Sequence, residues 1–167
     1  MKEQYQQHLI MLYLDKNYIG VRMKSELLVV PAQLVHQNWH LAAPLLQKAI
    51  EKGDGEFLLN DLQSACSRGE QQLLLIMVDG ECVCAFTVIQ YNFPRHRQMY
   101  MSYIGGKQTK EGWEQFKQWT LNQGCDRVSG SATSESIARL WKKQFGFESK
   151  YITVEMKLNK EDKDAKG

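Results

Sequence analysis

One short segment of the sequence combines residue types that can bind a phosphate group. Two glycines and a lysine stand between an apolar segment and a helical pattern, in the order Ile104-Gly105-Gly106-Lys107-Gln108-Thr109. Glycines at the junction of a strand and a helix let backbone N–H groups and the positive helix end face an anion, and a lysine adds charge. The same glycines also suit an ordinary tight turn that binds nothing. The segment therefore predicts a phosphate site, with the ordinary turn as the alternative.

One histidine pair and one cysteine pair have residue types that can bind a metal. His36 and His40 lie four residues apart in a predicted helix, but no third ligand accompanies them, so we expect surface or packing histidines. Cys82 and Cys84 alternate within a predicted strand, which would place both on one side of it. Buried cysteines behave as small apolar residues, and we expect that role rather than a metal or redox site. The sequence predicts no metal centre.

Basic and aromatic residues leave further alternatives open. The run Arg95-His96-Arg97 suits either an acidic or phosphate-bearing partner or a solvated turn. Trp113 and Trp119 suit either stacking on a base or a helix in which one ring packs inward and the other lies at the rim. The serines around residue 130 form no Gly-x-Ser-x-Gly elbow, which argues against a serine hydrolase.

Composition and charge exclude several broad classes of protein. The 167 residues carry 21 basic and 19 acidic side chains, a balance that argues against general nucleic-acid binding. The longest apolar runs, such as 9–14 and 73–78, fall far short of the roughly 20 residues that cross a bilayer. The first residues are polar and resemble no secretory signal, so we expect a cytoplasmic protein.

The elements that must position these residues follow from periodicity and turn signals. Asp79-Gly80 predicts a tight hairpin turn between two strands. The expected strands are 27–30, 72–78, 81–90, 98–104, 126–131 and 151–158, and the expected helices are 31–50, 59–67, 111–123 and 134–144. This order predicts an α/β (α+β) fold with one mixed sheet, antiparallel in its first half, and helices on both faces.

The two ends of the chain differ from the segment between them. Residues 1–25 show no sustained period and are predicted to be an N-terminal extension. Residues 159–167 alternate lysines with acidic residues and have no apolar anchor, which predicts a disordered tail. Residues 26–158 are expected to form a single domain.

The order of elements and two local patterns resemble the GNAT superfamily of N-acetyltransferases, over roughly residues 27–158. The patterns are the turn Gly124-Cys125-Asp126 before a strand, and Ala138, Leu140 or Trp141, Gly146 and Phe147 at the end of the next helix. The resemblance implies a GNAT-like fold, acetyl-CoA as cofactor, and transfer of an acetyl group to an amine. It also implies that residues 104–109, Ile104 to Thr109, hold the pyrophosphate of acetyl-CoA.

The sequence departs from the family pattern at three places. The acetyl-CoA loop, Arg/Gln-x-x-Gly-x-Gly/Ala in the family, is only partly matched by residues 104–109. Trp141 or Lys142 stands where many members have a tyrosine that protonates the departing thiolate. The strand 98–104 contains no carboxylate, so a base would come from elsewhere, with Glu56 and Asp61 as candidates. The catalytic residues are left unassigned.

A narrower resemblance concerns GNAT-like proteins encoded by phages and prophages, in which a Gly-Gly-Lys turn replaces the usual loop. It rests on Gly55-Glu56-Phe57, Asn60-Asp61-Leu62, Phe93-Pro94-Arg95 and Gly105-Gly106-Lys107 followed by Trp113. It implies an alternative function, that of a non-catalytic virion or accessory protein that contacts phage structural proteins through the same fold. Such a protein would lie in the host cytoplasm or the virion.

Overall fold

The computed structural model describes residues 25–158. The tail predicted for 159–167, and all of the predicted extension except Ser25, lie outside the described residues. The chain divides into two compact units between Ser131 and Ala132, and each is described by itself below. The single domain expected for residues 26–158 stays a prediction.

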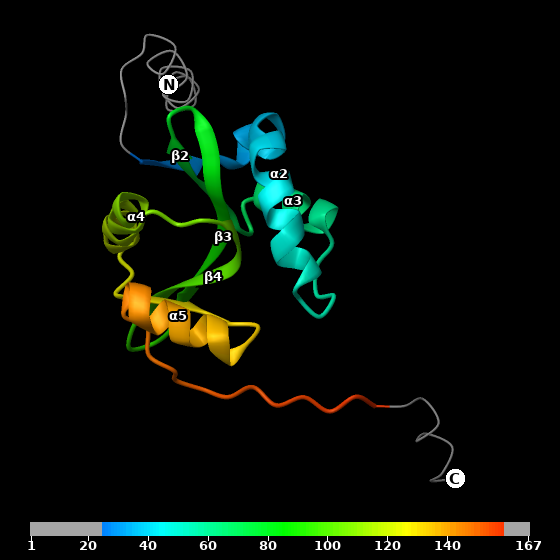
Figure 1. The fold of residues 1–167 in the computed structure, drawn as a ribbon, viewed down its shortest axis with the longest axis vertical. Helices are drawn as coiled ribbons and strands as arrows, with labels where there is room; N and C mark the ends of the chain where they lie inside the picture. Colours follow the sequence, from blue (N-terminus) through cyan, green and yellow to red (C-terminus); the bar gives the residue numbers. More distant parts are fainter. Residues whose placement is uncertain (1–24, 159–167) are drawn as a thin grey trace. The chain divides into compact units, whose positions relative to one another are not determined.

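The first unit is built on a five-stranded mixed sheet (Figure 1). Neighbouring strands follow chain order, and the first four are antiparallel while the fourth and fifth run parallel. The fold class predicted from the sequence is thereby confirmed. The strands are β1 (Glu26–Val30), β2 (Gln72–Val78), β3 (Glu81–Asn92), β4 (Arg97–Gly106) and β5 (Arg127–Gly130).

Helices cover both faces of this sheet. A 3-10 turn, η1 (Ala32–Leu34), leads into α2 (Val35–Glu51), which lies with α3 (Leu59–Ser67) on one face, while α4 (Lys110–Asn122) lies on the other (Figure 1). The apolar side chains on one side of α2 are buried because they meet the apolar residues of β2. That core contains Val30, Val35, Trp39, Ala42, Leu46, Leu62, Leu73, Leu75 and Met77.

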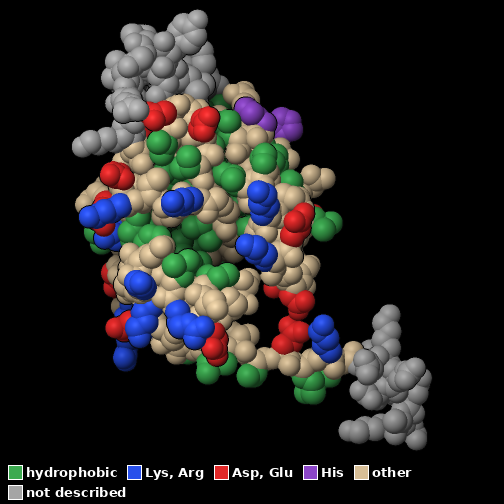
Figure 2. Space-filling view, viewed as in Figure 1, with side chains coloured by type: hydrophobic (Ala, Val, Ile, Leu, Met, Phe, Trp, Pro, Cys, Tyr) green, Lys and Arg blue, Asp and Glu red, His purple; other side chains and the backbone are tan. Residues whose placement is uncertain are grey.

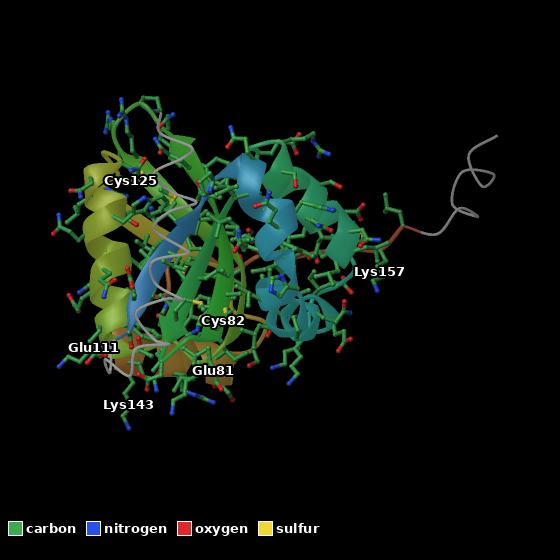
Figure 3. All side chains as sticks on the ribbon, turned by 90° about the horizontal axis from the view of Figure 1, so that it is seen from above. Glu81, Cys82, Glu111, Cys125, Lys143 and Lys157 are labelled. Carbon is green, nitrogen blue, oxygen red and sulfur yellow. The ribbon has the colours of Figure 1, made fainter. Side chains whose placement is uncertain are left out.

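The opposite face is packed by the aromatic residues of α4. Phe116 meets Phe86 of β3 edge to face, with the ring centroids 5.0 Å apart. Trp113 is buried and Trp119 is half-buried. This agrees with the second of the two predictions for these residues, in which one ring packs inward and the other lies at the rim. Figure 3 shows Glu111 and Cys125 at opposite ends of α4. The helix therefore spans the strands with its N-terminus just after β4 and its C-terminus just before β5.

Strand β4 is longer than the sequence predicts, because both glycines belong to it. Gly105 pairs with Ala85 and Gly106 with Cys84, so this part of the predicted Gly-Gly turn is strand. A Cβ on Gly105 would lie 2.1 Å from the carbonyl oxygen of Leu45 in α2. A Cβ on Gly106, which has φ +87°, would lie 2.2 Å from the carbonyl oxygen of Val83. Glycine is required here by the close approach of backbone to backbone.

The two neighbouring cysteines lie on opposite faces of the sheet, and the expectation that they share one side is wrong. Cys82 pairs with Met77 and Cys84 with Ile76, so the extra residue Val83 makes a bulge. Met77 belongs to the core under α2, whereas Ile76 lies beside Gly112 of α4. The predicted role of Cys84 as a buried small residue is confirmed, since its side chain is fully buried.

Within its described residues, 132–158, the second unit contains one helix, α5 (Glu135–Phe145), and an extended segment. Ser134 caps the helix by accepting a hydrogen bond from the Ile137 N–H, and Gly146 ends it with a left-handed φ of 74°. The strand predicted for 151–158 is wrong for the described chain. A strand needs a partner for its backbone groups, and no described strand pairs with this segment.

The extended segment instead presents its large apolar side chains to solvent. Tyr151, Ile152, Val154, Met156 and Leu158 are 79–92% exposed. Figure 2 shows apolar side chains along this segment. Within residues 25–158, no helix has the length and hydropathy that crossing a membrane requires.

The close approach at Gly105 gives a first testable expectation. Gly105→Ala forces β4 away from α2 and lowers the free energy of unfolding by about 2 kcal/mol, the usual cost of overpacking. Gly53→Ala is the matched control, because its added Cβ would meet its nearest atoms only at 3.2 Å. Chemical denaturation of both variants measures the difference, and equal losses would contradict the packing argument.

The buried thiols give a pH dependence of stability. Burial raises the pKa of Cys66 and Cys84 from 9.0 to about 12 and that of Cys82 to about 11. The unfolded chain therefore loses these protons first, so the stabilisation is complete below pH 9 and falls as the pH rises toward 11–12. The free energy of unfolding, measured in urea, is expected to fall between pH 7 and pH 10. In Cys66→Ala this fall should be smaller than in the wild type by about 1 kcal/mol. Ser67→Ala is the control and should lose as much stability over this pH range as the wild type. If Cys66→Ala also loses as much as the wild type, burial does not raise the pKa of Cys66.

Candidate functional site

Strands β4 and β5 run together for only four residues. Their pairing begins at Gln98 with Arg127 and ends at Met101 with Gly130. Beyond Met101, β4 continues to Gly106 with β3 on one side and no described strand on the other. Its backbone N–H and C=O groups on that side have no sheet partner within residues 25–158, which makes this edge a place where an extended ligand can bind.

The predicted phosphate segment lies where β4 passes into α4. Ile104 is half-buried, Gly105 is buried, and Gly106 and Lys107 are exposed. The N–H of Lys107 donates a 2.8 Å hydrogen bond to the Val83 carbonyl and is therefore already used within the fold. Thr109 caps α4 by accepting a hydrogen bond from the Gly112 N–H, so its hydroxyl also serves the helix.

Other donors of the same junction are better placed for an anion. The N–H groups of Lys110 and Glu111 belong to the first turn of α4, where a helix offers no internal acceptor. The side chain of Gln108 folds back so that its Oε1 accepts from the Thr109 N–H, while its Nε2 is buried without a partner in the described chain. A buried donor that lacks an acceptor is costly, and a ligand oxygen would satisfy it.

A bulge in β4 organises the strand just before this junction. Thr87 of β3 pairs with Tyr103, whereas Val88 pairs with Met101, so Ser102 is the extra residue. Ser102 Oγ donates to Gln71 Oε1 at 2.5 Å and accepts from Thr87 Oγ1 at 2.7 Å. Gln71 and Thr87 are themselves buried, so these bonds fix the position of the bulge.

Tyr103 and Glu56 form a polar pair beside β4. Both Glu56 Oε2 and Tyr103 Cε1 lie within 3.9 Å of the point that a Gly53 Cβ would occupy. Burial raises the pKa of the Tyr103 phenol, and the charges of Glu56 and Tyr100 raise it further. Phe57 packs edge to face against Tyr103, with centroids 6.0 Å apart. The arrangement brings a carboxylate close to a phenol whose pKa is raised, in the part of β4 that β5 does not pair with.

The structure distinguishes the two carboxylates named as candidate bases. Asp61 Oδ2 accepts a 3.1 Å hydrogen bond from the Leu58 N–H and so serves the start of α3. Glu56 is exposed, and its carboxylate accepts from the Asp54 N–H at 3.1 Å. Only Glu56 is among the groups whose charge acts on Tyr103. Tyr103 and Tyr100 were not predicted as site residues, although both lie in the strand predicted for 98–104.

The remaining candidates lie apart from this arrangement or in the second unit. His36 Nδ1 lies 3.1 Å from Gln63 Nε2, at a hollow of about 330 Å³ between α2 and α3. Within residues 25–158, no three His, Cys, Asp or Glu side chains are close enough to hold a metal ion. Trp141 of α5 packs its ring 5.4 Å from that of Phe147. Arg95 and Arg97 are exposed at the β3–β4 connection.

Comparison with known proteins gives structural likeness without sequence likeness. No family model and no curated protein sequence matches the chain. A ribosomal-protein-alanine N-acetyltransferase from Brucella melitensis biovar Abortus 2308 matches with a TM-score of 0.60 at 12% identity, over 81% of this chain and 100% of that one.

Two aminoglycoside acetyltransferases are similar to the same extent. One, in complex with CoA, has a TM-score of 0.58 at 10% identity over 81% of this chain and 95% of its own. The other, from an uncultured soil metagenomic sample and bound to sisomicin, has a TM-score of 0.57 at 11% identity over 81% and 97%. At these identities the likeness concerns the fold, and the chain has the fold of the GNAT N-acetyltransferases.

The pair of Tyr103 and Glu56 can be tested by titration. Because the Glu56 charge disfavours the phenolate, Glu56→Gln is expected to lower the pKa of Tyr103 toward its ordinary value while leaving it above that value through burial. Carbon-13 NMR of labelled tyrosines follows the ionisation, with Tyr103→Phe identifying the signal. Glu81→Gln, at the far β2–β3 turn, is the control. An unchanged Tyr103 pKa in Glu56→Gln would show that the two groups do not interact.

Proposed function

We propose that this protein is an acetyl-CoA-dependent N-acyltransferase whose site lies along the open edge of β4. The observation that carries the proposal is the parting of β4 from β5 at Met101, directly before the first turn of α4. The three similar acetyltransferases described above support it through their shared fold.

The cofactor fits the donors found at the junction of β4 and α4. Among the residues 104–109 first proposed, Gln108 offers a buried donor without an acceptor, and Gly106 and Lys107 form the exposed rim. The N–H groups of Lys110 and Glu111 face an anion at the helix start, with the Lys110 ammonium adding charge. We assign these groups to the pyrophosphate. When bound, acetyl-CoA supplies an acetyl thioester that an amine can attack.

The protein's own residues would orient the reactants and move one proton. The backbone N–H groups of β4 beyond Met101 would polarise the thioester carbonyl. Glu56 would accept the proton of the attacking amine, directly or through a water molecule. As the amide C–N bond forms, the thioester C–S bond would break, and CoA would leave as a thiolate that takes a proton from solvent. Tyr103, whose raised pKa keeps the phenol protonated, would position the amine or donate a hydrogen bond. Trp141 and Lys142 take no part in this assignment.

A second candidate is a non-catalytic protein that keeps the fold for protein contacts, as a phage virion or accessory protein. Two observations favour it. The glycines at 105 and 106 are required by backbone packing alone, and the Lys107 N–H is occupied by Val83. The two candidates differ in whether acetyl-CoA binds.

A thermal shift measurement tests cofactor binding. Acetyl-CoA at millimolar concentration is expected to raise the melting temperature, because it binds only the folded state. Lys110→Glu removes one charged contact and is expected to weaken binding about tenfold. Lys117→Glu, an equal charge change in the same helix, is the control, since Lys117 pairs with Glu114 away from the junction. No shift with acetyl-CoA or CoA would overturn the proposal and leave the non-catalytic candidate, to be tested by its copy number in purified particles.

Release of free CoA in the presence of amines tests the chemistry. Glu56→Gln is expected to lower kcat about 100-fold, the usual effect of removing a general base, without changing the acetyl-CoA thermal shift. Asp61→Asn, whose carboxylate caps α3, should lower stability and leave kcat nearly unchanged. Equal effects of the two substitutions on kcat would remove Glu56 from its role.

A further inference from the structure

A row of aromatic side chains lies on the face of the sheet that carries α2 and α3. Tyr91 lies 6.1 Å from Phe93 and 6.1 Å from Tyr100, measured between ring centroids. Tyr100 is close enough to Tyr103 to affect its pKa, and Tyr103 contacts Phe57 at 6.0 Å. We call these five residues the aromatic strip. Tyr91 and Phe93 are 41% and 46% exposed, so much of its outer end is open to solvent.

The two ends of the aromatic strip carry opposite charges. Glu56 stands at the inner end, beside Tyr103. At the outer end, Arg127 of β5 lies level with Gln98 of β4, which in turn pairs with Tyr91, so these three side chains share one face. Arg95 lies in the nearby connection of β3 and β4. Within residues 25–158, neither arginine has a carboxylate at ion-pair distance.

The spacing and length of the aromatic strip match an extended polypeptide. Alternate side chains of an extended chain repeat at about 6.6 Å, close to the ring separations of the strip. From Gln98 to Tyr103, β4 advances as far as the β3 steps from Tyr91 to Thr87, because Ser102 is the extra residue of the bulge. This distance is roughly 13 Å, which an extended chain covers from its first residue to its fifth. An amine at Glu56 would therefore belong to the same segment as an acidic side chain near Arg127, five or six residues along.

We propose that the aromatic strip binds the amino-terminal segment of an acidic polypeptide, with its terminal amine at Glu56 and an acidic side chain about five residues later at Arg127. Apolar side chains at alternate positions stack on Tyr91, Phe93 and Tyr100. The position of the amine rests on the function proposed above, whereas binding to the strip does not. A polycationic aminoglycoside fits less well, because Arg127 and Arg95 would repel its ammonium groups.

Binding is tested without acetyl-CoA, using the full chain and a hexapeptide labelled with fluorescein at its carboxyl end. The peptide has a free amino terminus, apolar residues at alternate positions and glutamate at positions five and six, and a matched peptide has lysine there instead. Fluorescence anisotropy is expected to show at least tenfold tighter binding of the glutamate peptide. Equal affinity for both peptides would overturn the proposal.

Surface variants locate the binding. Tyr91→Ala and Phe93→Ala are each expected to weaken the glutamate peptide about fivefold, as loss of one aromatic contact predicts. Arg127→Glu is expected to reverse the preference between the two peptides. Leu121→Ala is the control, because Leu121 is 59% exposed on α4, which packs on the opposite face. Unchanged affinity in all three strip variants, or displacement of the peptide by sisomicin at equal concentration, would overturn the proposal.

The outcome is separable from that of the proposed function. Peptide binding that depends on the strip, without a thermal shift by acetyl-CoA or CoA, would support the strip and refute the acyltransferase. Acetyl transfer to another amine, with no peptide binding, would refute the strip and leave the acyltransferase standing. Transfer to the free amino end of the glutamate peptide, lost in Arg127→Glu with a raised KM and unchanged kcat, supports both.

Discussion

The backbone contact between Gly105 in β4 and Leu45 in α2 is the constraint on which the rest of the site depends. A Cβ at this position would stand 2.1 Å from the Leu45 carbonyl oxygen, so only glycine lets the helix approach so closely. Because α2 lies against the end of β4, the segment that follows the helix passes over the same strand. Glu56 and Phe57 belong to that segment and reach Tyr103. The glycine thus affects the position of Glu56 and Phe57 through packing.

The second constraint is the unequal pairing of β4 with its neighbours. On one side β4 pairs with β3 along its whole length, and on the other it pairs with β5 only from Gln98 to Met101. The bulge at Ser102 falls where the two strands part and is held by buried Gln71 and Thr87. One rigid strand therefore presents an open backbone edge, a tyrosine beside a carboxylate, and a direct passage into a helix start. These features together are the ones on which the proposed acyltransferase site rests.

Most helices and strands were predicted correctly from local sequence patterns, because side-chain periodicity and turn residues within a short segment decide them. The helix at 59–67 and the turn at Asp79-Gly80 agree with the structure, since side-chain period and left-handed turn residues are properties of short segments. The strand at 151–158 was wrong for the opposite reason. Its alternation is strand-like, but a strand requires a partner, and no described strand provides one. The phosphate site at residues 104–109 was predicted from the two glycines and stays a prediction. In the structure these glycines are required by backbone packing, and the donors without a partner are Gln108 Nε2 and the first N–H groups of α4.

The sequence by itself determined the order of elements, the mixed sheet with its antiparallel first half, and the junction of β4 and α4 as a candidate site. Only the tertiary structure decided which carboxylate lies beside Tyr103 and which aromatic rings lie next to one another across β3 and β4. It also decided that the Lys107 N–H donates to the Val83 carbonyl within the fold. Glu56 and Asp61 are near neighbours in sequence and both carry a carboxylate, and no local pattern separates them. They differ in the path of the segment between α2 and α3, which brings Glu56 close to Tyr103. That path depends on the packing of α2 on β4, and hence on contacts between residues far apart in the chain.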